Sequence, residues 1–93
     1  MTQFLAIVAY RCLIAGSPEG SLDLQVQWYK AHDETSVRDL IAGKPLHAYK
    51  NDDGETVSWE LAEVLAVEPF APTNSGEEVV GFIASTQELV ELA

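Results

Sequence analysis

Apolar and polar residues follow one another with spacings that predict strands and short helices. Residues 3–15 are largely apolar at both odd and even positions, and they are rich in β-branched and aromatic side chains. This pattern is typical of a central strand that is covered on both faces. The turn cluster Gly-Ser-Pro-Glu-Gly follows at residues 16–20, so we expect this strand to form a hairpin with the next one.

The next segment alternates strictly between apolar and polar residues. Its apolar row consists of Leu22, Leu24, Val26 and Trp28. The residues between them, Asp23, Gln25 and Gln27, are polar. This alternation predicts a half-exposed antiparallel strand whose apolar row, Trp28 included, lies in the core.

A helical period replaces the alternation at residues 34–42. Three apolar residues recur there at helical spacing, namely Val37, Leu40 and Ile41. The spacing predicts a short helix that lies on the sheet. Asp33 or Thr35 can cap its start by accepting a backbone N–H. Gly43 predicts an end in the left-handed conformation.

Residues 46–50 then predict a short strand, and Asn-Asp-Asp-Gly at 51–54 predicts a tight turn. Residues 55–70 predict a long strand whose odd positions form an apolar row, and we expect Trp59 on that row to lie in the core. Glu63 interrupts that row, which implies a β-bulge near 61–64 or a strand end beyond the sheet edge.

The last part of the chain predicts one more strand and one more helix. Residues 77–84 are rich in Val, Phe and Ile, and Ser-Thr-Gln-Glu at 85–88 matches a capping box. The predicted order is β-β-α-β-β-β-α. We therefore expect one α+β domain over residues 1–93, with a mainly antiparallel sheet of four to five strands and one or two short helices on one face.

The net negative charge belongs entirely to the second half of the chain. Lys and Arg total 5 and Asp and Glu total 15, so the formal charge is −10. Residues 1–50 hold five bases and five acids, whereas residues 51–93 hold ten acids and neither Lys nor Arg. We expect this charge to form a solvated face that favours solubility. A basic protein partner is the electrostatic alternative.

The composition also disfavours several partners and locations. Nucleic-acid binding needs clustered bases, and the five bases here are scattered. No apolar run approaches the roughly 18–20 residues that span a membrane, and no basic stretch precedes the apolar N-terminus as in a secretory signal. With a single cysteine, Cys12, these features predict a cytoplasmic protein without nucleic-acid or membrane partners.

We expect no enzymatic activity and no metal or cofactor, because no complete catalytic or cofactor motif is present. Cys12 lies among apolar residues, where a buried and inert thiol is expected. The turn at 51–54 resembles part of a calcium loop, but the frame that fits Gly54 places Tyr49 where the first carboxylate is required. We therefore interpret the segment as a turn.

Four residues are candidates for an interaction surface: Tyr29, Glu60, Glu63 and Glu68. Tyr29 falls on the row opposite Trp28, and an exposed tyrosine offers a large contact area with a polar tip. The alternative to an interaction surface is a small-molecule or metal site that combines carboxylates such as Glu60 and Glu63 with His47.

Two segments carry a family resemblance. The sequence Asn-Asp-Asp-Gly-Glu-Thr-Val-Ser-Trp at 51–59 follows a strand pair and a helix start that reads Ala-His-Asp-Glu-Thr-Ser at 31–36. With these features, residues 4–84 resemble the bacterial domain-of-unknown-function family numbered 4288. His32 is an insertion relative to the pattern of that family. The matching residues are turn and core residues, so the resemblance implies a fold and brings no activity, cofactor or catalytic residue.

The sequence thus predicts a small acidic protein-interaction domain. A second copy is one expected partner, because a two-sided apolar strand in 93 residues needs cover on both faces. The other version is an inhibitor or immunity-type protein that binds a basic partner through charge complementarity.

Overall fold

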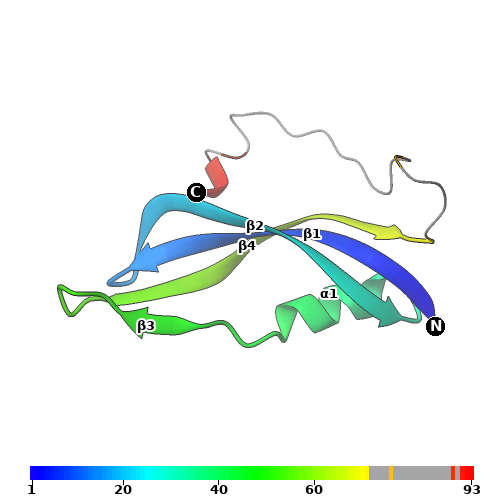
Figure 1. Cartoon of the computed structure of the whole chain (residues 1–93), viewed down its shortest axis with the longest axis horizontal. Coiled ribbons are helices and arrows are strands. Elements are labelled where there is room, and N and C mark those ends of the chain that lie inside the picture. The colour runs from blue at the N-terminus through cyan, green and yellow to red at the C-terminus, as the bar shows by residue number, and fades with distance from the viewer. Residues whose placement is uncertain (72–75, 77–88, 90) are drawn as a thin grey trace.

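One antiparallel sheet with a helix on one side forms the body of the protein (Figure 1). A computed structural model describes residues 1–71, 76, 89 and 91–93. Its elements are β1 (Thr2–Ile14), β2 (Ser17–Ala31), α1 (Glu34–Ala42), β3 (Ala48–Lys50) and β4 (Thr56–Pro69). The α+β class and the antiparallel sheet are confirmed. No helix among the described residues is long and apolar enough to span a membrane.

Two predicted elements lie mainly outside the part of the chain that the structure describes. The fifth strand at 77–84 lies outside the described residues, as does most of the terminal helix. Of that helix, Leu89, Glu91 and Leu92 are described, and their backbone is helical. The described order is therefore β-β-α-β-β.

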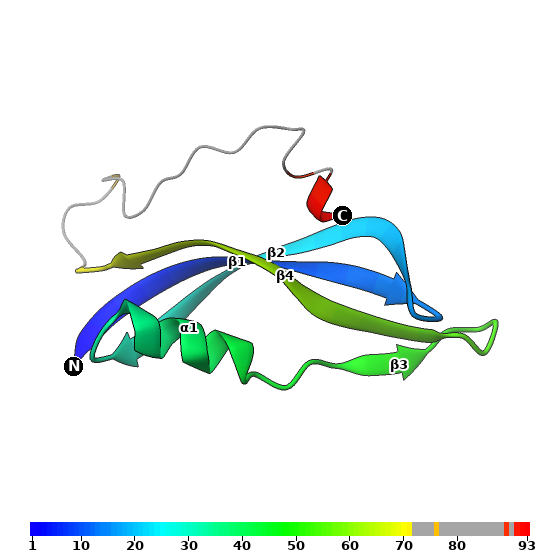
Figure 2. The ribbon, with the colours of Figure 1, turned by 180° about the vertical axis from the view of Figure 1, so that it is seen from behind.

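The strand order β2-β1-β4-β3 places β1 in the interior of the sheet, as predicted. We call the side that carries α1 the helix face and the other side the far face; Figure 2 shows both from behind. The even-numbered residues of β1 from Phe4 to Cys12 point to the helix face, and those from Phe4 to Tyr10 share the core with Val37 and Ile41 of α1. The odd-numbered residues from Leu5 to Leu13 point to the far face, since side chains alternate along a strand.

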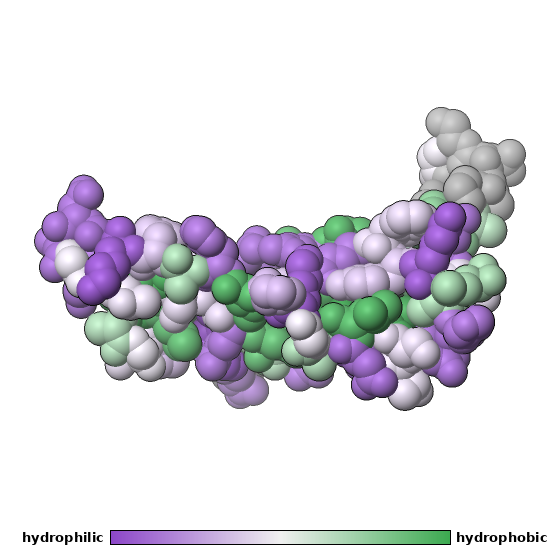
Figure 3. Space-filling view, turned by 90° about the horizontal axis from the view of Figure 1, so that it is seen from below, coloured by the Kyte–Doolittle hydropathy of each residue, from purple (hydrophilic) through white to green (hydrophobic). Residues whose placement is uncertain are grey.

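The hydrophobic core lies between the helix face and α1. Its buried members are Phe4, Ala6, Val8, Tyr10, Ala31, Val37, Ile41 and Val67. Leu40, the third residue of the predicted helical stripe, is exposed instead. In Figure 3, which looks onto the side of α1 and β3, hydrophobic residues gather along the middle and the end near the 51–55 turn is hydrophilic.

The bounds of α1 agree with the prediction, and Asp33 is the N-cap. Its carboxylate accepts a hydrogen bond from the Ser36 backbone N–H at 2.8 Å. The predicted left-handed end at Gly43 is wrong, because this residue has a right-handed φ of −87°. The N–H groups of Gly43 and Lys44 bond back to the carbonyls of Asp39 and Ile41, so the helix ends without a left-handed reversal.

Two tight turns connect consecutive strands, one between β1 and β2 and the other between β3 and β4. The β1–β2 loop contains only Ala15 and Gly16, both with positive φ, as in the two-residue hairpin turns that match strand twist. The predicted hairpin is confirmed, although its loop is shorter than the 16–20 cluster. At 51–54 the Asn51 side-chain oxygen accepts from the backbone N–H groups of Asp53 and Glu55, and Gly54 has a φ of 77°. This segment is the predicted turn.

The interruption at Glu63 is a β-bulge, as predicted. The register between β1 and β4 shifts twice, between Ile7 and Val8 and again between Ala9 and Tyr10. Each shift leaves one residue of β4, Leu65 or Ala62, without a partner in the register. Glu63 consequently faces Ala9 on the far face and does not enter the core.

Candidate interaction surface

β2 presents its two rows opposite to the prediction. The apolar row was expected in the core, yet Leu24, Val26 and Trp28 expose 49%, 68% and 54% of their surface. In contrast, Gln27 from the polar row exposes 9%. The prediction that Trp28 is a core residue is therefore wrong, whereas Trp59 packs against the core as predicted.

The polar row of β2 occupies the helix face because its side chains satisfy one another. The Tyr29 hydroxyl donates to Gln27 Oε1 at 2.6 Å, and Gln27 Nε2 donates to the Tyr10 hydroxyl at 2.9 Å. Gln27 Nε2 also donates to Gln25 Oε1 at 2.8 Å, and Gln25 Nε2 donates to Asp23 Oδ2 at 2.7 Å. We call this chain the polar ladder. It offsets the cost of placing amides and hydroxyls beside an apolar core.

The apolar row, Leu22, Leu24, Val26 and Trp28, lies on the far face. Three of its four cross-strand partners on β1 are also apolar, since Trp28 faces Leu5, Val26 faces Ile7 and Leu24 faces Ala9, whereas Leu22 faces Arg11. Ile7 and Ala9 are buried. The far face thus carries an apolar strip two strands wide, whose exposed side belongs to β2.

Two contacts fix the Trp28 ring on this strip. Its indole Nε1 donates to Gln3 Oε1 at 3.2 Å. The Lys30 Nζ lies 5.4 Å from the ring centroid, within the range of a cation–π interaction. A ring held in this way loses little further conformational entropy on binding, which favours its use as a contact residue.

β2 is also an edge strand among the described residues. Alternate N–H and C=O groups along its outer side have no strand partner there, which is a template for pairing with another chain. Proteins commonly protect such edges with proline, lysine or a bulge. Residues 21–29 contain neither Pro nor Lys, and their register with β1 is regular from Leu22 to Ala31.

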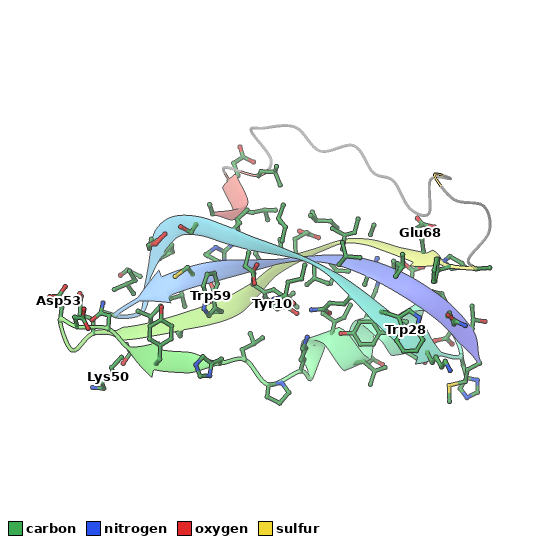
Figure 4. The ribbon with its side chains drawn as sticks, in the orientation of Figure 1. Tyr10, Trp28, Lys50, Asp53, Trp59 and Glu68 are labelled. Carbon is green, nitrogen blue, oxygen red and sulfur yellow. The ribbon has the colours of Figure 1, made fainter. Side chains whose placement is uncertain are left out.

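On the other side of β1, β4 adds carboxylates to the far face. Glu60, Glu63 and Glu68 face Arg11, Ala9 and Leu5 in the register, so all three share this face. Figure 4 shows Glu68 on the side of the sheet away from α1. Glu63 and Glu68 are exposed. We call these three residues the acidic row.

Arg11 connects the acidic row to the end of the chain. Its Nη1 forms an ion pair with Glu60 Oε1 at 2.6 Å, and its Nε donates to the Leu92 carbonyl at 2.6 Å. The backbone at Leu92 therefore contacts the sheet on the far face. Because Glu60 forms an ion pair with Arg11, Glu63 and Glu68 carry the unpaired exposed charge of the acidic row among the residues that the structure describes.

The four predicted interaction residues do not form one surface. Tyr29 faces Phe4 on the neighbouring strand β1. It therefore lies on the helix face, on the other side of the sheet from the acidic row. Its hydroxyl is engaged in the polar ladder, and burial, with a smaller contribution from Tyr10, raises the pKa of Tyr29. Tyr29 is thus a partly buried structural residue that packs against the core.

A hollow of about 250 Å³ lies on the helix face beside the core. It is lined by Tyr10, Asp23, Gln25, Lys44, Pro45, Leu46, His47 and Trp59. Tyr10 and Trp59 are labelled in Figure 4, where they lie on neighbouring strands. His47 stacks on Tyr49, with ring centroids 6.0 Å apart. Glu60 and Glu63 are on the opposite face of the sheet, so they do not form one site with His47.

Cys12 is buried on the helix face. Burial and, to a smaller extent, Glu19 raise the pKa of its thiol, which keeps it protonated and poorly nucleophilic at neutral pH. No group of three His, Cys, Asp or Glu side chains in the described part of the chain is arranged to hold a metal ion.

Comparison with models of protein families finds no match, and neither does comparison with curated proteins or with solved structures. The resemblance to family 4288 therefore stays a prediction.

The sequence did contain a signal that the apolar row of β2 is exposed. Two glutamines and a tyrosine alternate with that row, and these side chains can form hydrogen bonds to one another when they are buried.

Proposed function

We propose that this protein is a non-enzymatic interaction domain whose contact surface is the apolar row together with the outer edge of β2. The observation that carries the proposal is the exposure of Leu24, Val26 and Trp28, all between 49% and 68% exposed, on one face of an edge strand. Scattered exposed apolar residues are ordinary, but a contiguous row of them is typical of a binding surface.

Burial of this row would contribute substantially to binding. Fully burying a Val, Leu or aromatic side chain contributes roughly 1.5–3 kcal/mol. Because these three are about half exposed, completing their burial would contribute on the order of 3 kcal/mol in total. Backbone hydrogen bonds along the edge would add direction and register, as in β-strand addition.

The non-enzymatic character is supported by the positions of the reactive side chains. Cys12 is a buried thiol with a raised pKa, and His47 is separated by the sheet from Glu60 and Glu63. We further propose a cytoplasmic location, because a lone buried thiol is compatible with a reducing compartment.

A matched pair of variants tests the proposal. Val26→Lys places a charge in the middle of the apolar row, whereas Leu40→Lys changes a similarly exposed residue on α1. Partners captured from source cells are identified, purified and tested again with each variant. We expect a partner that binds the wild type and Leu40→Lys but loses at least tenfold in affinity for Val26→Lys. Equal binding by all three proteins would contradict the proposal.

A basic partner is a second version, favoured by the exposed Glu63 and Glu68 beside the apolar strip. Binding of this kind weakens with salt, because surface charges are screened. The double variant Glu63→Gln/Glu68→Gln should then bind more weakly and with a smaller salt dependence, whereas exchange of the turn residues Asp52 and Asp53 for Asn serves as a charge-matched control. Loss of binding in both variants alike would indicate net charge alone.

The hollow on the helix face favours a second candidate function, the binding of a small polar molecule. Lys44, His47 and Asp23 supply groups of both charge types at its wall, beside the aromatic ring of Trp59. Titration with small polar metabolites, followed by nuclear magnetic resonance, would shift the Trp59 indole and His47 ring signals but not Trp28. Movement of all three signals together would argue against a defined site.

A further inference from the structure

We infer that the partner of the β2 edge is a second copy of this chain, paired antiparallel about Gln25 so that the four described strands of each copy join into one sheet of eight. This inference rests on the proposed function, because it uses the same edge. It adds the identity of the partner and the register of the contact.

The self-complementary pattern of β2 carries the argument. Residues 21–29 alternate between polar and apolar, and the alternation is symmetric about Gln25. When a strand pairs with its own copy around a two-fold axis, residues at equal distances from the axis face each other and share a face. With Gln25 on the axis, Leu24 faces Val26 of the second copy, and Leu22 faces Trp28. The two apolar rows then form one continuous cluster.

The other face of the same register is also matched. Gln25 faces its own copy, and Asp23 faces Gln27 of the second copy. Amide side chains can donate and accept at once, so this register leaves the exposed side of the polar row with compatible neighbours. One alignment therefore joins apolar with apolar and polar with polar on both faces.

Neighbouring registers are poorer. An axis at Val26 places Lys30 opposite Leu22, and an axis at Leu24 places Trp28 opposite Gly20, which has no side chain to contact. An axis at Asp23 brings two carboxylates together, which is destabilising. The sequence of β2 thus favours Gln25 as the centre.

The strongly negative charge does not prevent this arrangement. β2 itself carries only Glu19, Asp23 and Lys30, and the acidic row is on β4, two strands away. Across the paired edges, the two acidic rows are separated by five strand spacings of about 4.8 Å, roughly 24 Å in total. That distance exceeds the Debye length of about 8 Å at physiological ionic strength. Repulsion between the rows is therefore largely screened.

Disulfide trapping tests the register directly. In Gln25→Cys the two new thiols would face each other across the axis, at a Cα separation of about 4.5–5.5 Å that a disulfide spans. In Asp23→Cys the thiols would lie four residues apart along the strand, roughly 13 Å, beyond the reach of a disulfide. Leu40→Cys is an exposed control on α1, and the buried Cys12 is common to all variants.

We expect a concentration-dependent dimer of the wild type in analytical ultracentrifugation, which Val26→Lys shifts to at least tenfold higher concentration. Under mild oxidation, Gln25→Cys should form a covalent dimer at least tenfold faster than Asp23→Cys or Leu40→Cys. A wild type that stays monomeric at millimolar concentration overturns the inference, as does faster trapping of Asp23→Cys. If that monomer still binds another protein and Val26→Lys weakens this binding, the proposed function as an interaction domain stands. Only the inference that the partner is a second copy is then wrong.

Gln25 takes part in the polar ladder, so a second measurement is independent of that residue. The chain has two tryptophans, and Trp59→Phe leaves Trp28 as the sole tryptophan, which is excited selectively over the tyrosines at long wavelength. Dimer formation covers Trp28, and its emission should shift to the blue as concentration rises, with the same midpoint as sedimentation. Emission that does not change while the mass doubles would overturn this interface.

Discussion

On the helix face, β2 contributes the polar ladder to the border of the core, whereas on the far face it leaves Leu24, Val26 and Trp28 exposed to solvent. The difference follows from what covers each face. α1 packs over the helix face and buries whichever row lies beneath it. On the far face, the described residues leave the edge strand open. Which row of the edge strand β2 is buried therefore follows the position of the covering element, and hydrophobicity alone does not determine it.

The clearest test of this contrast compares two valines. Val8 is fully buried on the helix face, and Val26 is exposed on the far face. Val8→Asp would bury an unpaired charge and should lower the free energy of unfolding by at least about 3 kcal/mol. Val26→Asp should change it by less than about 0.5 kcal/mol. Chemical denaturation at low protein concentration measures both, and similar losses in the two variants would contradict the assignment of the faces.

The covering helix has a comparable contrast within one turn. Ile41 is 2% exposed against the sheet, and the neighbouring Leu40 is 51% exposed. Ile41→Ala should cost about 2–4 kcal/mol, since a buried aliphatic side chain is removed. Leu40→Ala should cost less than about 0.5 kcal/mol. Thermal unfolding followed by circular dichroism distinguishes them, and a larger effect at Leu40 would mean that α1 is rotated about its axis.

The polar ladder provides a smaller effect. Gln27→Leu leaves the buried Tyr10 hydroxyl and the Tyr29 hydroxyl without this partner and should cost about 1–2 kcal/mol. Gln3→Leu is the matched control on the far face, where the lost hydrogen bond to Trp28 is exposed, and it should be nearly neutral. If Gln27→Leu instead stabilised the protein, the apolar alternative would be the better core and the ladder would require another explanation.

The smallest effect concerns the cap of α1 and acid. The hydrogen bond from Ser36 lowers the pKa of Asp33 below its ordinary value of 3.8. Because the folded pKa is the lower one, the cap stabilises the fold above pH 3.8 and loses this effect as the pH falls through the folded pKa. Asp33→Ala should remove that part of the acid sensitivity, and Asp33→Ser should retain the cap. Helical signal measured against pH checks this, and identical acid profiles for wild type and Asp33→Ala would contradict it.

Features that depend on neighbours in sequence were predicted well. The bounds of α1, its cap at Asp33 and the turn at Asn51 follow from local hydrogen bonding. The bulge beside Glu63 followed from one acid on an apolar row. Alternation in β2, however, specifies only that two rows exist. Which row is buried depends on where α1 crosses the sheet and on whether polar side chains can pair, and both are tertiary properties.

The candidate site shows the same division. Glu60, Glu63 and Glu68 were grouped from the sequence, and they share the far face once both bulges are counted. Tyr29 was grouped with them because Trp28 was expected in the core. Because β2 presents its two rows opposite to the prediction, Tyr29 lies on the helix face. Trp28, which the sequence pattern placed in the core, lies on the proposed contact surface instead.

The paired bulges of β4 also bear on how the chain tolerates insertions and deletions. Between Phe4 and Ile14, β1 uses eleven residues, while β4 uses thirteen from Val57 to Pro69. The two extra residues, Ala62 and Leu65, are absorbed without turning any other side chain to the wrong face. A length change elsewhere in β4 would exchange the core and surface rows beyond it. In this strand, natural gains and losses of single residues should therefore be found at these two positions.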